Sequence, residues 1–255
     1  MHLILTGATG LVGSAVLDAM IKTQTISKIS ILSRRPVPMA DDAHDPRINV
    51  IIHKDFNTYD KALLEQLQDA TGCVWALGIS QASVGKEDYI QITKSYPLAF
   101  ASAFQTLPPR PPTQPFNFVY VSALGATLTP GRFTSLFGRV KGETEILLGE
   151  MRKANPSFRA TSVRPAFVNS CDHDAIKGYK PALGMARTVA EWGFTALARI
   201  KPSLDGPTEP LGRFMTEVAM GGWDGRLEGE GVEKLDGGMD VVENFAFRRL
   251  VGLDK

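Results

Sequence analysis

The N-terminal segment restricts the fold of this chain more than any other part of the sequence. An apolar run from Leu3 to Thr6 leads directly into the glycine-rich turn Thr6-Gly-Ala-Thr-Gly-Leu-Val-Gly13. A stretch with helical periodicity follows at once, from Leu11 to Lys22. Strand, glycine turn and helix in immediate succession form the first half of a βαβ unit, in which helices cover a parallel sheet.

Each glycine of this turn has a separate task in that geometry. Gly7 permits the sharp turn, Gly10 lets backbone amides approach a pyrophosphate, and Gly13 lets the helix pack closely on the sheet. The N–H groups and the dipole at the start of the helix favour an anion, and the Thr9 hydroxyl adds a donor. The turn therefore predicts dinucleotide binding; the alternative is that its glycines only make a tight connection.

The same rhythm continues over the first two thirds of the chain and sets the expected fold. Short apolar runs predict strands at 3–6, 29–32, 49–53, 73–77, 118–121 and 160–163, and amphipathic stretches predict helices at 11–22, 60–69, 86–105 and 141–153. We expect a Rossmann-type α/β fold with a doubly wound parallel sheet. Residues 1–170 are its predicted core, and residues 171–255 a C-terminal, substrate-side region of the same domain.

Prolines predict two local departures from this pattern. Pro97 lacks an amide donor, so the third helix should kink or restart near Ser95-Tyr96. The proline-rich segment from Leu107 to Pro115 should be a solvated, partly polyproline II loop that acts as a stiff spacer. Its PxxP spacing leaves an SH3 or WW ligand as the alternative.

Composition narrows the class of partner. The chain has 255 residues, of which 44% are hydrophobic, enough for one large α/β domain, and its formal net charge is +1. So small a charge favours a small-molecule substrate over nucleic acid, and leaves a protein partner or a homo-oligomer open. We expect no membrane span, since every apolar stretch is too short. Two distant cysteines and an N-terminus unlike a signal peptide predict a cytoplasmic protein.

The end of the second strand selects between the two nicotinamide dinucleotides. An acidic residue at this position usually holds the ribose hydroxyl of NAD(H). This chain has Ser33-Arg34-Arg35 there instead. Two guanidinium groups suit a 2′-phosphate through charge-assisted hydrogen bonds, so the sequence predicts NADP(H). The alternative is that both arginines are solvated loop charges.

Several motifs resemble one family over about residues 1–170. They are Thr6-Gly-Ala-Thr-Gly-Leu-Val-Gly13, Trp75-Ala-Leu-Gly78, Val121-Ser-Ala-Leu-Gly-Ala126, Val140-Lys-Gly-Glu143 and Arg164-Pro165. The chain resembles the atypical and extended short-chain dehydrogenases/reductases, and most of all the Tat-interacting oxidoreductase-like group with its fungal relatives. Beyond this region the resemblance extends mainly to Leu211–Ala219, whose counterpart is a late helix.

The resemblance implies further cofactor contacts. An acid such as Asp55 accepts from the adenine amino group with Phe56 against the ring, and small residues at 76–78 let the backbone approach the ribose. Asp55 has the alternative of a turn or cap residue, and Pro165 that of a strand terminator. The complete predicted cofactor set is Gly7, Thr9, Gly10, Leu11, Val12, Gly13, Arg34, Arg35, Asp55, Phe56, Ala76, Leu77, Gly78, Lys141, Pro165 and Val168.

The catalytic positions depart from the family at one residue. By resemblance, Ser122 orients a substrate carbonyl and Lys141 holds the ribose, but Phe137 stands where the family has its proton-donating tyrosine. We therefore name Tyr120 as a substitute, because it shares a strand face with Ser122. Weaker candidates are Tyr89, Tyr96 and His173. For Lys141, the alternative is an ordinary helix-surface ion pair with Glu145, four residues later.

These observations leave two main hypotheses. The first is an NADP(H)-dependent oxidoreductase that acts on a small carbonyl or enone with a modified proton relay. The second is a non-catalytic NADP(H)-binding redox sensor or regulatory protein, which Phe137 favours. A sugar-nucleotide epimerase is a weaker third, since it also uses a tyrosine and needs a longer C-terminal region.

Overall fold

The computed structural model describes residues 1–107, 114–180 and 201–254. One sheet dominates it, with the strand order β3-β2-β1-β4-β5-β6-β10-β9. All neighbouring pairs in this sheet are parallel except β9 with β10. The strands are β1 (His2–Thr6), β2 (Lys28–Ser33), β3 (Ile48–Ile52), β4 (Gly72–Trp75), β5 (Phe116–Val121), β6 (Phe158–Arg164), β9 (Val232–Lys234) and β10 (Asp240–Glu243).

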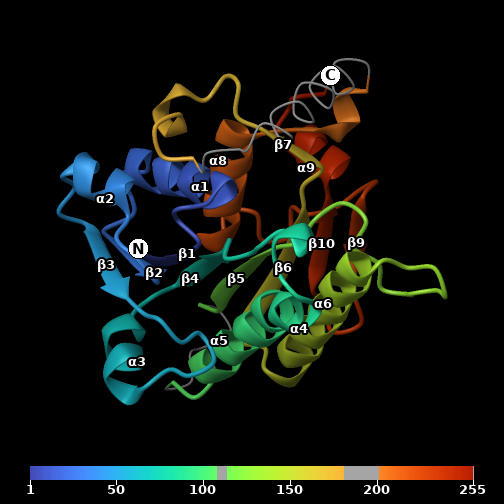
Figure 1. Cartoon of the computed structure of the whole chain (residues 1–255), viewed down its shortest axis with the longest axis horizontal. Coiled ribbons are helices and arrows are strands. Elements are labelled where there is room, and N and C mark those ends of the chain that lie inside the picture. The colour runs from blue at the N-terminus through green and yellow to red at the C-terminus, as the bar shows by residue number, and fades with distance from the viewer. Residues whose placement is uncertain (108–113, 181–200, 255) are drawn as a thin grey trace.

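Helices cover both faces of this sheet (Figure 1). The helices are α1 (Leu11–Lys22), α2 (Pro38–Ala43), α3 (Lys61–Leu67), α4 (Lys86–Ile90), α5 (Tyr96–Phe104), α6 (Leu136–Ala154), α8 (Thr208–Ala219) and α9 (Asn244–Leu250). In β1, Leu3 and Leu5 join the core beneath α1 and α8, whereas Ile4 joins the core beneath α3 and α5. All five residues of β1 are buried on one face or the other, which explains its continuous apolar run.

The predicted fold class is confirmed, and the six predicted strands are β1 to β6. The helix expected from Lys141 begins at Leu136 instead. The region after residue 170, which we expected on the substrate side, also adds two strands to the sheet. Strand β10 pairs with β6, and β9 pairs with β10 at the edge. A second, two-stranded sheet joins β7 (Phe167–Asn169) and β8 (Asp205–Pro207). Strands β7 to β10 have three or four residues each, which are too few to show the alternation of apolar and polar residues typical of a strand.

The expected irregularity near Ser95-Tyr96 is present. A π-helical turn, Gln91–Ser95, separates α4 from α5. Pro97 lies in the first turn of α5, where a missing amide costs little. The proline-rich loop falls mostly on residues 108–113, which lie outside the described residues.

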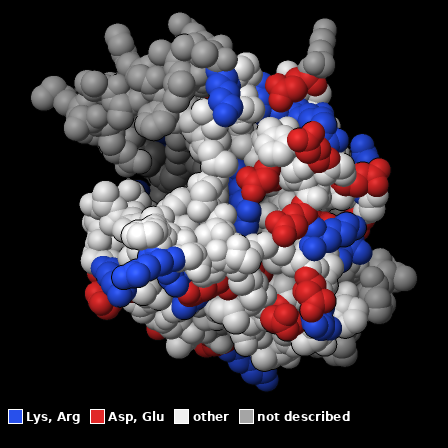
Figure 2. Space-filling view, turned by 90° about the vertical axis from the view of Figure 1, so that its right-hand side faces the viewer, with Lys and Arg blue, Asp and Glu red and all other residues white. Residues whose placement is uncertain are grey.

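The surface and composition agree with a protein of nearly balanced charge. Figure 2 shows Lys and Arg intermixed with Asp and Glu over one side of the molecule, with no broad field of one sign. Within the described ranges, no helix is long and apolar enough to cross a membrane. Cys73 is buried and Cys171 exposed, and both are free thiols.

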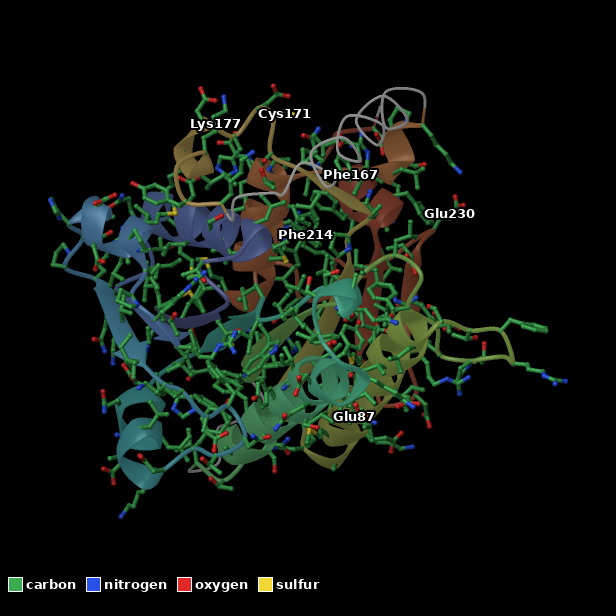
Figure 3. All side chains as sticks on the ribbon, viewed as in Figure 1. Glu87, Phe167, Cys171, Lys177, Phe214 and Glu230 are labelled. Atoms are coloured by element: carbon green, nitrogen blue, oxygen red, sulfur yellow. The ribbon has the colours of Figure 1, made fainter. Side chains whose placement is uncertain are left out.

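The packing of α8 on α1 depends on one close backbone approach. A Cβ atom at Gly212 of α8 would overlap the carbonyl oxygen of Ala15 in α1. Phe214, labelled in Figure 3, fills the adjoining core, with its ring centroid 5.5 Å from that of Phe247. Gly149 of α6 differs, because a Cβ there would meet Leu235 at an ordinary 3.6 Å.

We therefore expect opposite effects from two helical glycine substitutions. Gly212→Ala should lower the free energy of unfolding by about 1–3 kcal/mol, since the two helices must separate. Gly149→Ala should leave it unchanged or raise it by up to about 1 kcal/mol through helix propensity. Urea unfolding of both variants measures the difference. Equal stability of the two variants would contradict this account of the α1–α8 packing.

Candidate functional site

The candidate site lies at the edge of the sheet where the parallel strands end. Strands β1, β4, β5 and β6 are neighbours, and their carboxyl ends meet along this edge. The chain order reverses between β1 and β4, which makes a topological switch point. In open α/β sheets, ligands bind beside such a point.

The turn between β1 and α1 is built around backbone contacts. Gly7 has a φ of +73°, and a Cβ there would overlap the Ala76 carbonyl at the end of β4. A Cβ at Gly13 would overlap the carbonyl oxygen of Gly7. At Gly10, by contrast, the single close neighbour of a Cβ is the Gly7 oxygen, at 3.2 Å. Gly7 and Gly13 thus hold the turn together, and Gly10 keeps the start of α1 accessible.

The two arginines after β2 lie beside this turn. Both side chains are exposed, and the Arg35 guanidinium donates to the Thr9 hydroxyl at 3.3 Å. The Ser33 hydroxyl donates to the Arg35 carbonyl at 2.7 Å and so fixes the local backbone. The structure therefore places the Arg35 side chain beside the glycine turn, while Arg34 is exposed next to it in the chain.

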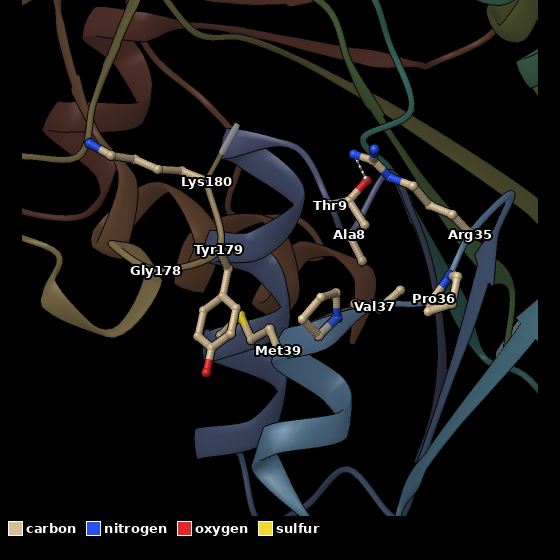
Figure 4. A pocket seen from close by; sticks show the side chains of 10 residues that line it. Ala8, Thr9, Arg35, Pro36, Val37, Met39, Gly178, Tyr179 and Lys180 are labelled. Carbon is tan, nitrogen blue, oxygen red and sulfur yellow. Dashed lines mark hydrogen bonds between the residues drawn. The ribbon is translucent and has the colours of Figure 1, made fainter. Parts of the chain in front are cut away.

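A cavity of about 460 Å³ opens next to Arg35 (Figure 4). One wall comes from a segment that we did not predict as part of the site, residues 178–180. Tyr179 lies against Met39 in this view, and its hydroxyl donates to the Asp42 carboxylate at 2.8 Å. Nothing in the local sequence pattern indicates this contact, because Tyr179 and Asp42 are far apart along the chain.

The pair after β3 is more structural than expected. Asp55 accepts hydrogen bonds from the backbone amide of Asn57 and from the Thr58 hydroxyl, which lower the pKa of its carboxyl. This is the turn-residue alternative, although Asp55 itself is exposed. Phe56 is fully buried, with its ring centroid 5.9 Å from that of Trp75. Its ring is therefore part of the core.

The end of β4 supplies small residues next to the turn. The backbone amide of Leu77 donates to the buried Thr6 hydroxyl at 3.2 Å, which ties β4 to β1. A Cβ at Gly78 would have open space around it. The backbone at 76–78 is thus close to the glycine turn, as the prediction requires.

Two polar side chains meet at the end of β5. Ser122 is buried, and its hydroxyl oxygen has no hydrogen-bond partner among the described residues. The ammonium group of Lys141 donates to the carbonyl of Val121, at 3.1 Å. That carbonyl belongs to the peptide unit shared with Ser122, so the lysine reaches the strand end at the serine.

Aromatic rings surround the Lys141 ammonium group. It lies 5.3 Å from the ring centroid of Tyr120 and 5.9 Å from that of Phe137. Such cation–π contacts attract the charge, but burial costs more and lowers the pKa of Lys141 to about 8. Phe137 lies one helical turn before the lysine, as the spacing predicts, and its backbone amide donates to the Gln81 side chain.

The structure gives the Tyr120 hydroxyl a partner that the sequence did not indicate. This hydroxyl is buried and donates to the carbonyl of Thr93, in the π-helical turn, at 3.0 Å. Burial raises the pKa of Tyr120 far above its ordinary value. Both facts oppose the predicted role of Tyr120 as proton donor. The signal that could have revealed the partner is Pro97, which marks the irregular helix that frees this carbonyl.

The weaker proton-donor candidates also occupy structural positions. His173 is buried between α1 and α8, where its ring nitrogens lie 2.9 Å from the Asp18 carboxylate and 2.9 Å from the Thr208 hydroxyl. Tyr89 is buried beside Thr93, and Tyr96 packs on the ring of Phe56.

Glu145 does not pair with Lys141 as the surface alternative required. It is fully buried and binds Arg164 at the end of β6 through two hydrogen bonds of 3.0 and 2.5 Å. Arg164 also binds Glu243 of β10 at 2.7 Å. The carboxylate of Glu145 is therefore committed to the arginine, and this ion pair joins α6 to the sheet.

The residues after β6 are fixed by backbone contacts. The carbonyl of Pro165 accepts from the Leu124 amide at 2.9 Å, which holds this segment against the loop after β5. Val168 lies in β7, pairs with Gly206 of β8 and is partly buried against the core beneath α1 and α8. Phe167, labelled in Figure 3, precedes it on the same short strand. Within the described residues, no cluster of His, Cys, Asp and Glu side chains could hold a metal ion.

Known proteins with similar sequences come from fungi. Leucinostatins biosynthesis cluster protein T of Purpureocillium lilacinum is 33% identical over 246 residues, which are 89% of this chain and 87% of that protein. The chain belongs to the family of this protein. Botcinic acid biosynthesis cluster B protein 16 of Botryotinia fuckeliana is 45% identical over 140 residues, 54% of this chain and 87% of that protein. No protein-family model matches the chain.

Solved structures confirm the fold. An oxidoreductase of the short-chain dehydrogenase/reductase family from Burkholderia thailandensis superposes with a TM-score of 0.65 at 13% identity, over 95% of this chain and 91% of that one. The PhqB reductase domain from Penicillium fellutanum gives a TM-score of 0.62 at 16% identity; 86% of this chain covers 64% of that domain. The fold is thus that of short-chain dehydrogenases/reductases, while the closer likeness to the Tat-interacting group stays a prediction.

The buried amine of Lys141 makes stability depend on pH. The unfolded chain has the ordinary lysine pKa of 10.5 and the folded chain about 8, so between these values the unfolded state binds the extra proton. Stability relative to Lys141→Met should therefore rise from pH 8 to pH 10.5, by roughly 1–3 kcal/mol in all.

Urea unfolding of both proteins between pH 7 and pH 10.5 measures this difference. Lys61→Met, which removes an exposed lysine from α3, controls for the loss of a positive charge. A constant difference between the parent and Lys141→Met across this range would show that Lys141 is not held in a low-dielectric site.

Proposed function

We propose that this protein is an NADP(H)-dependent oxidoreductase that reduces or forms a small carbonyl or enone. The observation that carries the proposal is a juxtaposition at one sheet edge. The glycine turn after β1, the small residues after β4 and the Ser122–Lys141 pair after β5 all lie where neighbouring parallel strands end. Relatives named for biosynthesis clusters support a small-molecule substrate.

The residues present fit a nicotinamide dinucleotide. Gly10 is the N-cap of α1, and the backbone N–H groups that follow it would bind the pyrophosphate. The buried Ser122 hydroxyl has no partner among the described residues, and a bound ligand would supply one. When bound, the cofactor supplies or accepts the hydride.

The protein side chains supply position and charge for that chemistry. The Ser122 hydroxyl would hydrogen-bond the substrate oxygen, and the cation of Lys141 would hold the ribose hydroxyls and stabilise negative charge. Arg34 and Arg35 would bind the 2′-phosphate, and Thr9 would add a hydroxyl donor to it. Pro165 and Val168, beyond β6, would line the nicotinamide end. We place this reaction in the cytoplasm, the reducing compartment that suits two free thiols.

Phe137 supports a second candidate, a non-catalytic NADP(H)-binding sensor. A phenyl ring beside Lys141 keeps the cation–π contact but offers no proton. Losing a general acid usually costs about a hundredfold to ten-thousandfold in rate. Tight NADPH binding with no reduction of aldehyde, quinone or enone probes would favour the sensor over the enzyme.

Cofactor choice tests the role of the arginine pair. We expect NADPH to bind at least about tenfold more tightly than NADH, because charge-assisted hydrogen bonds to the 2′-phosphate contribute about 1.5–3 kcal/mol each before screening. Arg34→Ala and Arg35→Ala should each reduce this preference and leave NADH affinity unchanged. Fluorescence titration of both cofactors measures it.

Arg213→Ala provides the matched control, because it removes an exposed arginine from α8. That variant should keep the full preference for NADPH. Equal affinities of the parent for the two cofactors would exclude a 2′-phosphate site at the end of β2.

Restoring the missing hydroxyl tests the descent of the site from a tyrosine-dependent reductase. In Phe137→Tyr the phenol would lie one helical turn from Lys141, whose charge lowers the phenol pKa. We expect NADPH-dependent reduction of at least one carbonyl probe to appear or to rise more than about tenfold. If the substitution instead slows an existing activity, Phe137 packs against the substrate and the proton comes from another group.

A further inference from the structure

The Ser122 hydroxyl has a position from which it can pass on a proton. It is buried at the end of β5 and has no partner among the described residues. The amine of Lys141 donates to the carbonyl of Val121, which belongs to the same peptide unit. The hydroxyl of Ser122 and the ammonium group of Lys141 therefore lie at the same strand end, without a hydrogen bond between them in this structure.

The other hydroxyls near this strand end are less suited to give up a proton. Tyr120 donates its proton to the Thr93 carbonyl, and burial raises its pKa. Tyr89 is buried beside the same π-helical turn, and burial raises its pKa too. Phe137 has no exchangeable proton. Among these groups, Lys141 alone combines an acidic N–H with a place next to Ser122.

We propose that Lys141 is the general acid of this site and that the Ser122 hydroxyl relays its proton to the substrate oxygen. The inference rests on the proposed oxidoreductase function and names its proton donor. It assigns to Lys141 a proton transfer in addition to its electrostatic role.

The step balances in atoms and charge. The bound cofactor would supply a hydride from its dihydronicotinamide C–H bond and would be oxidised to NADP⁺, while the substrate carbonyl carbon is reduced and the carbonyl π pair moves to oxygen. That oxygen takes the Ser122 hydroxyl proton. The ammonium group of Lys141 turns from the Val121 carbonyl to the serine oxygen and gives it a proton. The lysine is left as a neutral amine and is reprotonated by water before the next turnover. Alcohol oxidation runs through the same transfers in reverse.

The surroundings of Lys141 suit an acid near neutral pH. Burial lowers its pKa to about 8, so the amine is protonated at pH 7 but gives up its proton far more readily than an exposed lysine. The buried carboxylate of Glu145, one helical turn after Lys141, is already paired with Arg164 of β6. The titratable and charged groups that surround it are Tyr120 from β5, Glu145 from α6 with its partner Arg164 from β6, and the Lys94–Glu143 ion pair between the π-helical turn and α6.

Two measurements on the NADPH-bound protein test the relay. The first is the titration of the Lys141 side chain by NMR of ¹³Cε-labelled lysine, assigned by its loss in Lys141→Arg. The second is the single-turnover rate with 4-nitrobenzaldehyde and with 2-cyclohexen-1-one at saturating NADPH, from pH 6 to pH 9.5. NADPH affinity is measured for each variant, so that loss of binding and loss of proton transfer are separated.

We expect the reduction rate of the parent to fall with rising pH, with the midpoint at which Lys141 titrates. Lys141→Arg keeps a cation but is a far weaker acid, and should lower the rate at least about a hundredfold and remove this pH dependence. Ser122→Thr should retain more of the rate than Ser122→Ala, because it keeps a hydroxyl. Adding Phe137→Tyr to Lys141→Arg should restore at least about a tenfold gain.

Three results would overturn the relay. One is a pH dependence that persists in Lys141→Arg but disappears in Tyr120→Phe or Tyr89→Phe. Another is a Lys141 titration more than about one unit from the midpoint of the rate. The third is a parent that binds NADPH and reduces neither probe while Phe137→Tyr does, which leaves the cofactor site intact. Failure of the parent to bind NADPH at all would instead remove the proposed function together with the relay.

Discussion

The close backbone approach at the end of β1 is the constraint on which the rest of this structure depends. Gly7 touches the end of β4 and Gly13 touches Gly7, so strand, turn and helix can meet only without side chains at these two positions. That contact sets the N-terminus of α1 against the switch point of the sheet. Because α8 in turn packs on α1 through Gly212, the position of α8 depends on the same turn.

A second constraint, the buried charge around β6, explains the isolation of Lys141. Arg164 takes both oxygens of Glu145 and binds Glu243 as well, which fastens α6 to β6 and β10. A buried carboxylate must be paired, and this one is already satisfied. The lysine one turn earlier is left with a backbone carbonyl and two aromatic rings, so its charge is destabilised relative to water and its pKa falls.

The fold could be predicted from the sequence where one short segment contains the whole signal. Strands β1 to β6 and the glycine turn between β1 and α1 are each specified within a few neighbouring residues. Contacts between segments that are far apart in the chain could not be predicted. The Tyr120 hydroxyl donates to the Thr93 carbonyl, and the Tyr179 hydroxyl donates to the Asp42 carboxylate. No hydrophobic periodicity predicts either hydrogen bond. Strands β9 and β10 are too short to show alternation, and Phe56 joins the core because Trp75 and Tyr96 come from other elements.

Phe137 stands where the resemblance predicts a tyrosine, and its contacts with Lys141 show what the phenyl ring does there. A phenyl ring preserves the packing and the cation–π contact with Lys141 while removing the acid that such a lysine would otherwise assist. Desolvation therefore still disfavours the charged form of the Lys141 amine, although Phe137 offers no phenol hydroxyl that this charge could assist. Lys141 and Ser122 are thus two polar groups at the end of β5 whose requirements the described residues meet only in part.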